Sequence, residues 1–175
     1  MDLKDESLSQ ILDYAIQMET DGIEFYQKAS EKTSHPFGKK MFLSLADDEA
    51  FHLEVLKNVA REYKIPDVTT FKKDTPYEKV KTLFDELRDV MKERVSVSSD
   101  DLQALEVAIK MEQKGYEAYK REAESASDQE GKTLFEYLVR EEIEHLRILQ
   151  NTYHYLENSK EWFLWEERGL LDGGG

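Results

Sequence analysis

The stretch LADDEAFHL, from Leu45 to Leu53, places a glutamate and a histidine among apolar residues. Phe42, Leu45, Glu49, His52 and Leu56 follow one another at spacings of three, four, three and four residues. This spacing marks one face of an α-helix and is typical of the buried seam of a helix bundle. Residues three apart project from the same face, so Glu49 and His52 should point into the core together.

The same pattern returns ninety-three residues later in LVREEIEHL, from Leu138 to Leu146. At this offset AIQMETDGIEFY (15–26) also aligns with AIKMEQKGYEAY (108–119), and GKKMFLSLADDEAFHLEVL (38–56) aligns with GKTLFEYLVREEIEHLRIL (131–149). Two similar amphipathic helices would explain matching apolar residues but not matching polar ones. The chain is therefore predicted to repeat one helical hairpin. The identical pairs include Glu19/Glu112, Gly22/Gly115, Tyr26/Tyr119, Phe42/Phe135, Glu49/Glu142, His52/His145 and Leu56/Leu149.

Each half of the chain is predicted to form a helix, a short loop and a second helix. Capping-box spacing of Ser7 with Gln10 and of Ser127 with Glu130 indicates where the first and fourth helices begin. His35, in the first loop, and His154 lack matched partners, and both are expected at the surface. The predicted helices cover roughly residues 7–32, 36–63, 99–125 and 128–158.

A long crossover, residues 64–97, joins the two hairpins, and Thr75-Pro76 is a good start for a connecting helix within it. Two short-looped hairpins joined by one long crossover form an all-α, ferritin-like antiparallel four-helix bundle. We expect this bundle to occupy residues 1–160. The remaining segment, 161–175, is rich in aromatic residues and is expected to pack over a bundle end or a partner subunit.

The composition excludes several classes of function. A net charge of -14 argues against nucleic acid or an anionic membrane as a partner, since phosphate binding needs a basic surface. The chain has no cysteine, which excludes disulfides, thiolate catalysis, iron–sulfur clusters and cysteine-bound zinc. The start, MDLKDESLSQ, has no apolar stretch resembling a signal peptide, and no segment approaches a membrane span, so a cytoplasmic protein is expected.

Six ligand-type side chains are predicted to meet in one cross-section of the bundle. Four buried, ionised carboxylates would be very unfavourable without compensating charge. Two divalent cations would balance them, with the two imidazoles as neutral ligands, and this mixture suits iron or manganese, with zinc also compatible. The sequence therefore predicts a dinuclear metal site whose candidate ligands are Glu19, Glu49, His52, Glu112, Glu142 and His145.

These paired Glu-x-x-His motifs resemble those of the ferritin-like di-iron carboxylate proteins, and within them the rubrerythrin branch. The resemblance covers residues 7–158. It implies that Glu19 and Glu112 bind iron from the first and third long helices, and that Glu49 and Glu142 bridge or cap the irons. It also implies two iron ions, a histidine ligand for each, and a homodimer.

The resemblance implies a non-haem oxidoreductase that reduces hydrogen peroxide or dioxygen. Rubrerythrins commonly carry a four-cysteine rubredoxin domain, which is missing here, so a separate protein should supply the electrons. They also have a further ligating glutamate where this chain has Gly115, which puts ligand switching in doubt. Two alternatives stay open: a protein that oxidises, stores or transfers iron, and a bundle whose metal only stabilises the fold.

Several residues next to the candidate ligands could support the predicted metal site. Asp48 and Glu141 each precede a motif glutamate and could orient a histidine, or could be ordinary surface acids. Tyr26 and Tyr119 share the ligand face and could hydrogen-bond to carboxylates or relay protons, or could be core residues. Gly22 and Gly115 are unusual inside helices and could leave room for an oxidant or allow close helix packing.

Overall fold

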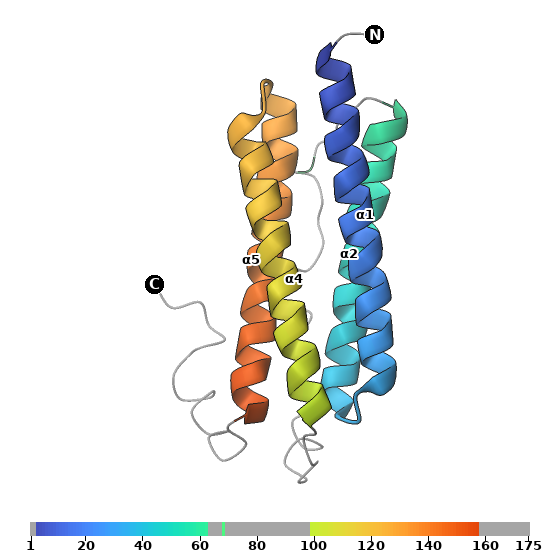
Figure 1. Cartoon of the computed structure of the whole chain (residues 1–175), viewed down its shortest axis with the longest axis vertical. Coiled ribbons are helices and arrows are strands. Elements are labelled where there is room, and N and C mark those ends of the chain that lie inside the picture. Colours follow the sequence, from blue (N-terminus) through green and yellow to red (C-terminus); the bar gives the residue numbers. More distant parts are fainter. Residues whose placement is uncertain (1–2, 63–67, 69–98, 158–175) are drawn as a thin grey trace.

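The described part of the chain folds into four long helices that lie side by side in a bundle (Figure 1). The computed structural model describes residues 3–62, 68 and 99–157. Consecutive helices run in opposite directions within each hairpin, and the chain ends α2 and begins α4 at opposite ends of the bundle (Figure 1). The predicted all-α, antiparallel four-helix bundle of two hairpins is confirmed. The four helices are α1 (Leu3–Lys32), α2 (Pro36–Glu62), α4 (Ser99–Ser125) and α5 (Gln129–Glu157).

The helix ends agree with the prediction except at two N-termini. Helix α1 begins at Leu3, so Ser7 lies inside the helix rather than at its cap. The preceding residues contain no glycine or proline that would stop the helix there. At α5 the predicted Ser127–Glu130 box is wrong, because Asp128 caps the helix by accepting a 2.7 Å hydrogen bond from the Gly131 N–H.

The loop between α1 and α2 contains a buried histidine. His35 is only 3% exposed, and the Gly38 N–H donates to its Nδ1 at 3.5 Å, at the position of an N-cap. The surface location predicted for His35 was therefore wrong, because the imidazole serves the first turn of α2. His154 does lie at the surface, with 69% of its side chain exposed.

Two apolar clusters fill the bundle, one on each side of a central polar layer. Each cluster draws on all four helices, and each of its fully buried Val, Leu, Ile, Phe and Met side chains contributes about 1.5–3 kcal/mol. Residues that match in the repeat fall in opposite clusters: Tyr26, Phe42 and Leu149 in one, and Tyr119, Phe135 and Leu56 in the other. The repeat thus places equivalent core layers around one central site.

Several predicted features fall outside the described residues. These are the crossover helix within 64–97 and the aromatic segment 161–175, so the proposed division into residues 1–160 and 161–175 stays a prediction. Within the described helices, none combines the length and the apolar character that crossing a bilayer requires.

Candidate metal centre

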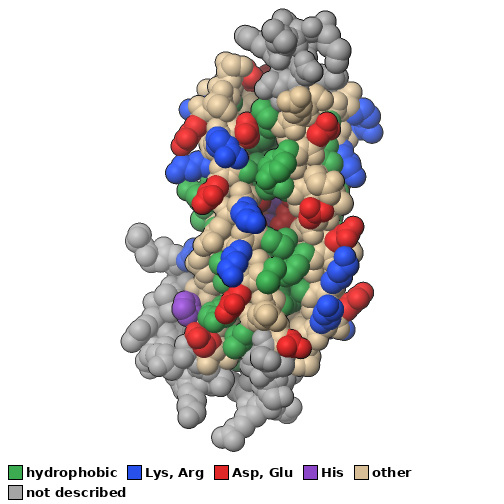
Figure 2. All heavy atoms as spheres, in the orientation of Figure 1, with side chains coloured by type: hydrophobic (Ala, Val, Ile, Leu, Met, Phe, Trp, Pro, Cys, Tyr) green, Lys and Arg blue, Asp and Glu red, His purple; other side chains and the backbone are tan. Residues whose placement is uncertain are grey.

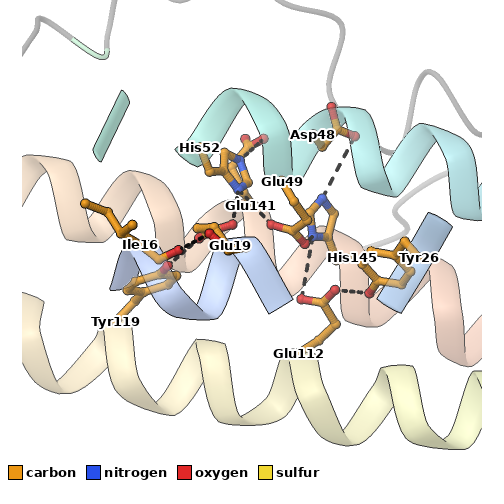
Figure 3. Close-up of polar contacts among 11 residues, drawn as sticks. Ile16, Glu19, Tyr26, Asp48, Glu49, His52, Glu112, Tyr119, Glu141 and His145 are labelled. Carbon is orange, nitrogen blue, oxygen red and sulfur yellow. Dashed lines mark hydrogen bonds and ion pairs between the residues drawn. The ribbon is translucent and has the colours of Figure 1, made fainter. Parts of the chain in front are cut away.

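The six candidate ligands converge in the middle of the bundle, and all are at most 5% exposed. Each hairpin contributes one glutamate from its first helix and a Glu-x-x-His pair from its second. All of these residues except Glu142 are labelled in Figure 3. The apolar residues three and four positions away on each helix, such as Leu45 and Leu138, are buried above and below them. The same helical periodicity that buries the leucines therefore buries the polar side chains.

Two groups of three residues could each hold a metal ion, and they share Glu49. One group is Glu19, Glu49 and His52, and the other is Glu49, Glu112 and His145, with candidate ligand atoms within 4.8 Å of one another in each. His52 Nδ1 lies 3.2 Å from Glu49 Oε2, and His145 Nδ1 lies 3.2 Å from Glu49 Oε1. The carboxylate of Glu49 thus lies between the two imidazoles (Figure 3).

Glu142 belongs to neither group, although it is the repeat partner of Glu49. A Cβ built on Gly115 would lie 3.0 Å from Glu142 Cδ and 3.1 Å from each of its carboxylate oxygens. On the equivalent glycine, Gly22, a Cβ would lie 3.4 Å from Glu49 Cγ. Gly115 therefore leaves room for the Glu142 carboxylate, whereas a Cβ at Gly22 would make only an ordinary contact with Glu49.

Two outer acids face the histidines from the opposite hairpin. Glu141 Oε2 lies 3.5 Å from His52 Nε2, and Asp48 Oδ2 lies 3.9 Å from His145 Nε2. Each histidine thus turns Nδ1 toward the candidate ligands and Nε2 toward an acid (Figure 3). An acid in this place fixes the ring orientation and raises the basicity of the ligating nitrogen. Of the two acids, Asp48 is buried and Glu141 is 18% exposed at its side chain.

Two tyrosines hydrogen-bond to Glu112 and Glu19, and each of these bonds also joins the two hairpins. The Tyr26 hydroxyl donates to Glu112 Oε1, and the Tyr119 hydroxyl donates to Glu19 Oε1 (Figure 3). Burial, followed by the charge of Glu112, raises the pKa of Tyr26. Burial and the charge of Glu19 act in the same way on the pKa of Tyr119. Both phenols therefore keep their protons at neutral pH and act as donors.

The protein by itself keeps protons in this cluster. Burial, and then the charge of Glu49, raises the pKa of Glu19 to about 8. Burial and the neighbouring Glu112 raise the pKa of Glu142 well above its usual 4.5. Burial would also favour the neutral form of Glu49, but hydrogen bonding with Glu19 and the proximity of His145 hold the pKa of Glu49 well below 4.5. Glu19 therefore holds a proton more readily than Glu49 does.

The two histidines of the cluster also hold their protons more strongly than usual. Burial disfavours the charged imidazole of His52, but Glu141, Glu19 and Glu49 outweigh it and raise the pKa of this residue. For His145, Glu49 and Glu112 outweigh burial in the same direction. A cation that binds here must therefore displace protons from carboxyl groups and imidazoles.

The donor set fits a pair of cations. Within the described part of the chain, Glu19 Oε2, Glu142 Oε2 and His145 Nδ1 have no hydrogen-bond partner despite their burial. Buried polar atoms in native proteins almost always find partners, so unmatched atoms that converge on one volume indicate a missing ligand. Carboxylate oxygens and imidazole nitrogens suit iron, manganese and zinc alike.

A cavity of about 300 Å³ connects this cluster with the groove between α1 and α4. Its inner wall includes Glu19, Glu49, Glu112 and Glu142. In the space-filling view, acidic side chains are visible in the middle of this face, between groups of hydrophobic side chains (Figure 2). A small molecule can therefore approach the carboxylates from outside. Sequence reasoning missed two wall pairs at the repeat offset, Met18/Met111 and Asp21/Lys114, and the single residue Tyr14.

The methionine pair could have been found, because the matched sequences AIQMET and AIKMEQ contain it. Tyr14 could not, because its repeat partner is Val107, which lines a different cavity.

Comparison with known proteins gives one match. The family model described as Rubrerythrin matches residues 10–153, which include all six candidate ligands. No curated protein and no solved structure matches the chain significantly.

Proposed function

This chain belongs to the rubrerythrin family, and from that premise we propose that it is a non-haem di-iron oxidoreductase. Its proposed substrate is hydrogen peroxide or dioxygen, and its electrons would come from a separate carrier protein. The family domain and the Glu/His cluster support a di-iron carboxylate protein. The observation that carries the finer proposal is the cavity that leads from the surface to the four carboxylates.

The six clustered residues would hold the metals. Glu19, Glu49 and His52 would form one position, and Glu49, Glu112 and His145 the other, with Glu142 beside the second. When bound, an iron pair supplies two electrons and Lewis acidity to a peroxide or dioxygen molecule in the cavity. The shared Glu49 would keep the two positions close together.

The remaining residues would orient ligands and handle protons. Reduction of hydrogen peroxide to two water molecules consumes two electrons and two protons. The Tyr26 and Tyr119 hydroxyls already donate to Glu112 and Glu19, so each can pass a proton into the cluster if its oxygen accepts a replacement. Asp48 and Glu141 would hold the imidazoles in the ligating orientation.

The electrons must come from elsewhere. The chain contains no cysteine, so it carries neither a rubredoxin-type iron site nor a redox disulfide. The proposed donor is therefore a separate redox protein that docks on the bundle.

The experiment is anaerobic loading with ferrous iron, metal counting, and then addition of peroxide with and without a reduced donor such as rubredoxin. We expect about two irons per chain and repeated peroxide consumption only when the donor is present. Glu49→Ala should lose both irons, because Glu49 alone belongs to both groups. Glu142→Ala should retain at least one.

Glu54→Ala is the matched control, because Glu54 lies on the same helix but is exposed. It should bind iron as the natural chain does. A single slow oxidation followed by iron accumulation would instead indicate storage. If the folded protein binds less than one metal, the proposed centre is wrong.

A further inference from the structure

The two buried tyrosines are equivalent in the repeat, yet their surroundings differ on one side. Tyr119 stacks on Phe135 with ring centroids 6.2 Å apart, and Tyr26 stacks on Phe42 at 6.0 Å. Each hydroxyl donates to a glutamate of the opposite hairpin. On their inner sides, therefore, the two phenols have the same neighbours.

On the outer side, Tyr119 borders a cavity of about 220 Å³ in the groove between α1 and α4. We call it the Tyr119 cavity. Gln10, Tyr14 and Glu122 contribute polar groups to its wall, and Ala118 leaves the space open. A volume of this size with several polar partners has room for a few water molecules.

In the other half, Tyr26 does not line the corresponding space. The repeat partner of Ala118 is Phe25, whose ring lies edge-on against Tyr26 with centroids 5.5 Å apart. The repeat partner of Glu122 is Ala29. Phe25 and Ala29 line a larger cavity of about 700 Å³, but among the described residues on its wall Tyr26 is absent. A phenylalanine thus separates Tyr26 from the space that an alanine opens beside Tyr119.

We propose that the Tyr119 cavity is a one-sided water site, kept open by Ala118, through which solvent reaches Tyr119 but not its repeat partner Tyr26. Glu122 sits in the wall of the cavity, with 21% of its side chain exposed, where its carboxylate can accept hydrogen bonds from water. Tyr26 is the insulated counterpart.

The cavity of about 300 Å³ beside the candidate metal ligands does not remove this difference between Tyr119 and Tyr26. Glu19 and Glu112 both line it, so water there can reach both tyrosines through their glutamates equally. A peroxide or dioxygen molecule in that cavity would also displace its water. Water in the Tyr119 cavity would still reach Tyr119 while the substrate occupies the first cavity, and this consequence rests on the proposed function.

The test measures exchange of the two tyrosine hydroxyl protons with water by NMR, in zinc-loaded and in metal-free protein. We expect the Tyr119 hydroxyl to exchange at least tenfold faster than that of Tyr26. Ala118→Phe should slow Tyr119 to the rate of Tyr26, and the reciprocal Phe25→Ala should accelerate Tyr26. Tyr119→Phe and Tyr26→Phe assign the two signals.

Circular dichroism and the amide spectrum check that each variant is folded. If phenylalanine does not fit at position 118, Ala118→Leu provides the same test. Equal exchange at both hydroxyls, or an unchanged Tyr119 rate in a folded Ala118 variant, overturns the proposal. The exchange rates require neither iron nor turnover, so a failed peroxide assay with the predicted exchange pattern would reject only the proposed function.

Discussion

At the scale of single residues, Asp48 and Glu141 show how a sequence position becomes a contact across the bundle. Each lies one residue before a candidate ligand, which turns it about 100° around its helix axis. That turn directs Asp48 toward His145 and Glu141 toward His52, so each hairpin orients the histidine of the other. The sequence left open whether these residues were surface acids. Their contacts favour the orienting role.

We therefore expect Asp48→Asn to weaken binding of manganese or zinc by about 10–100-fold. The amide keeps the shape of the side chain but removes the charge that supports His145. Isothermal titration measures the effect, and Asp47→Asn is the control because Asp47 is the exposed neighbour. Equal affinities for the two variants would contradict the orienting role of Asp48.

Proton uptake by the cluster predicts how the stability of the metal-free protein depends on pH. The pKa of Glu19 rises from 4.5 to about 8 on folding, and the pKa values of His52 and His145 are also raised. Between pH 4.5 and about pH 8 the folded state therefore holds more protons than the unfolded state. The free energy of unfolding falls as the pH rises through this range. Glu49, with a lowered pKa, is ionised in both states throughout this window.

Urea unfolding with a chelator present should therefore give a lower free energy of unfolding at pH 8 than at pH 5.5. Glu19→Gln, which cannot ionise, should show a shallower decline. Saturating manganese should reverse the trend, because the metal replaces the protons. A free energy of unfolding that rises between pH 5.5 and 8 without metal would refute this account.

At the scale of the helices, the caps were harder to predict than the helices themselves. Ser127, Asp128 and Glu130 all suit the start of a helix, and the choice among them depends on which side chain reaches a free N–H. Asp128 does so at Gly131. His35 likewise adopts a capping position that its residue type does not suggest.

Asp128→Ala should destabilise the protein by about 1 kcal/mol, because the first turn of α5 loses its acceptor. Ser127→Ala should leave stability nearly unchanged. Thermal unfolding of the two variants under one set of conditions measures the difference. A larger loss of stability in Ser127→Ala would instead support Ser127 as the cap, as the sequence predicted.

At the scale of the whole molecule, the two groups of candidate ligands differ in what they connect. Glu19, Glu49 and His52 all belong to the hairpin of α1 and α2. The group of Glu49, Glu112 and His145 draws on both hairpins. A cation in the second group would therefore join the two halves of the bundle, whereas one in the first would not.

Zinc or manganese at a thousandfold excess over its Kd should stabilise the protein by about 4 kcal/mol, or roughly 10 °C in Tm. Glu112→Ala should remove more of this gain than Glu19→Ala. The two variants are well matched, since each also removes one hydrogen bond from a tyrosine. Equal losses of metal-dependent Tm would argue against a cross-linking role for the second position.

The helical hairpin repeat, the four-helix bundle and the convergence of six ligand-type side chains could all be predicted from the sequence. Helical periodicity and a repeat offset are local properties, and they decide which face of each helix is buried. Only the tertiary structure decided that Glu49 rather than Glu142 lies between the histidines, that the outer acids and tyrosines act across hairpins, and that one tyrosine borders a cavity. These features depend on how side chains from different helices pack together. Tyr119 and Tyr26, for example, are equivalent in the repeat, but Ala118 beside the first is replaced by Phe25 beside the second.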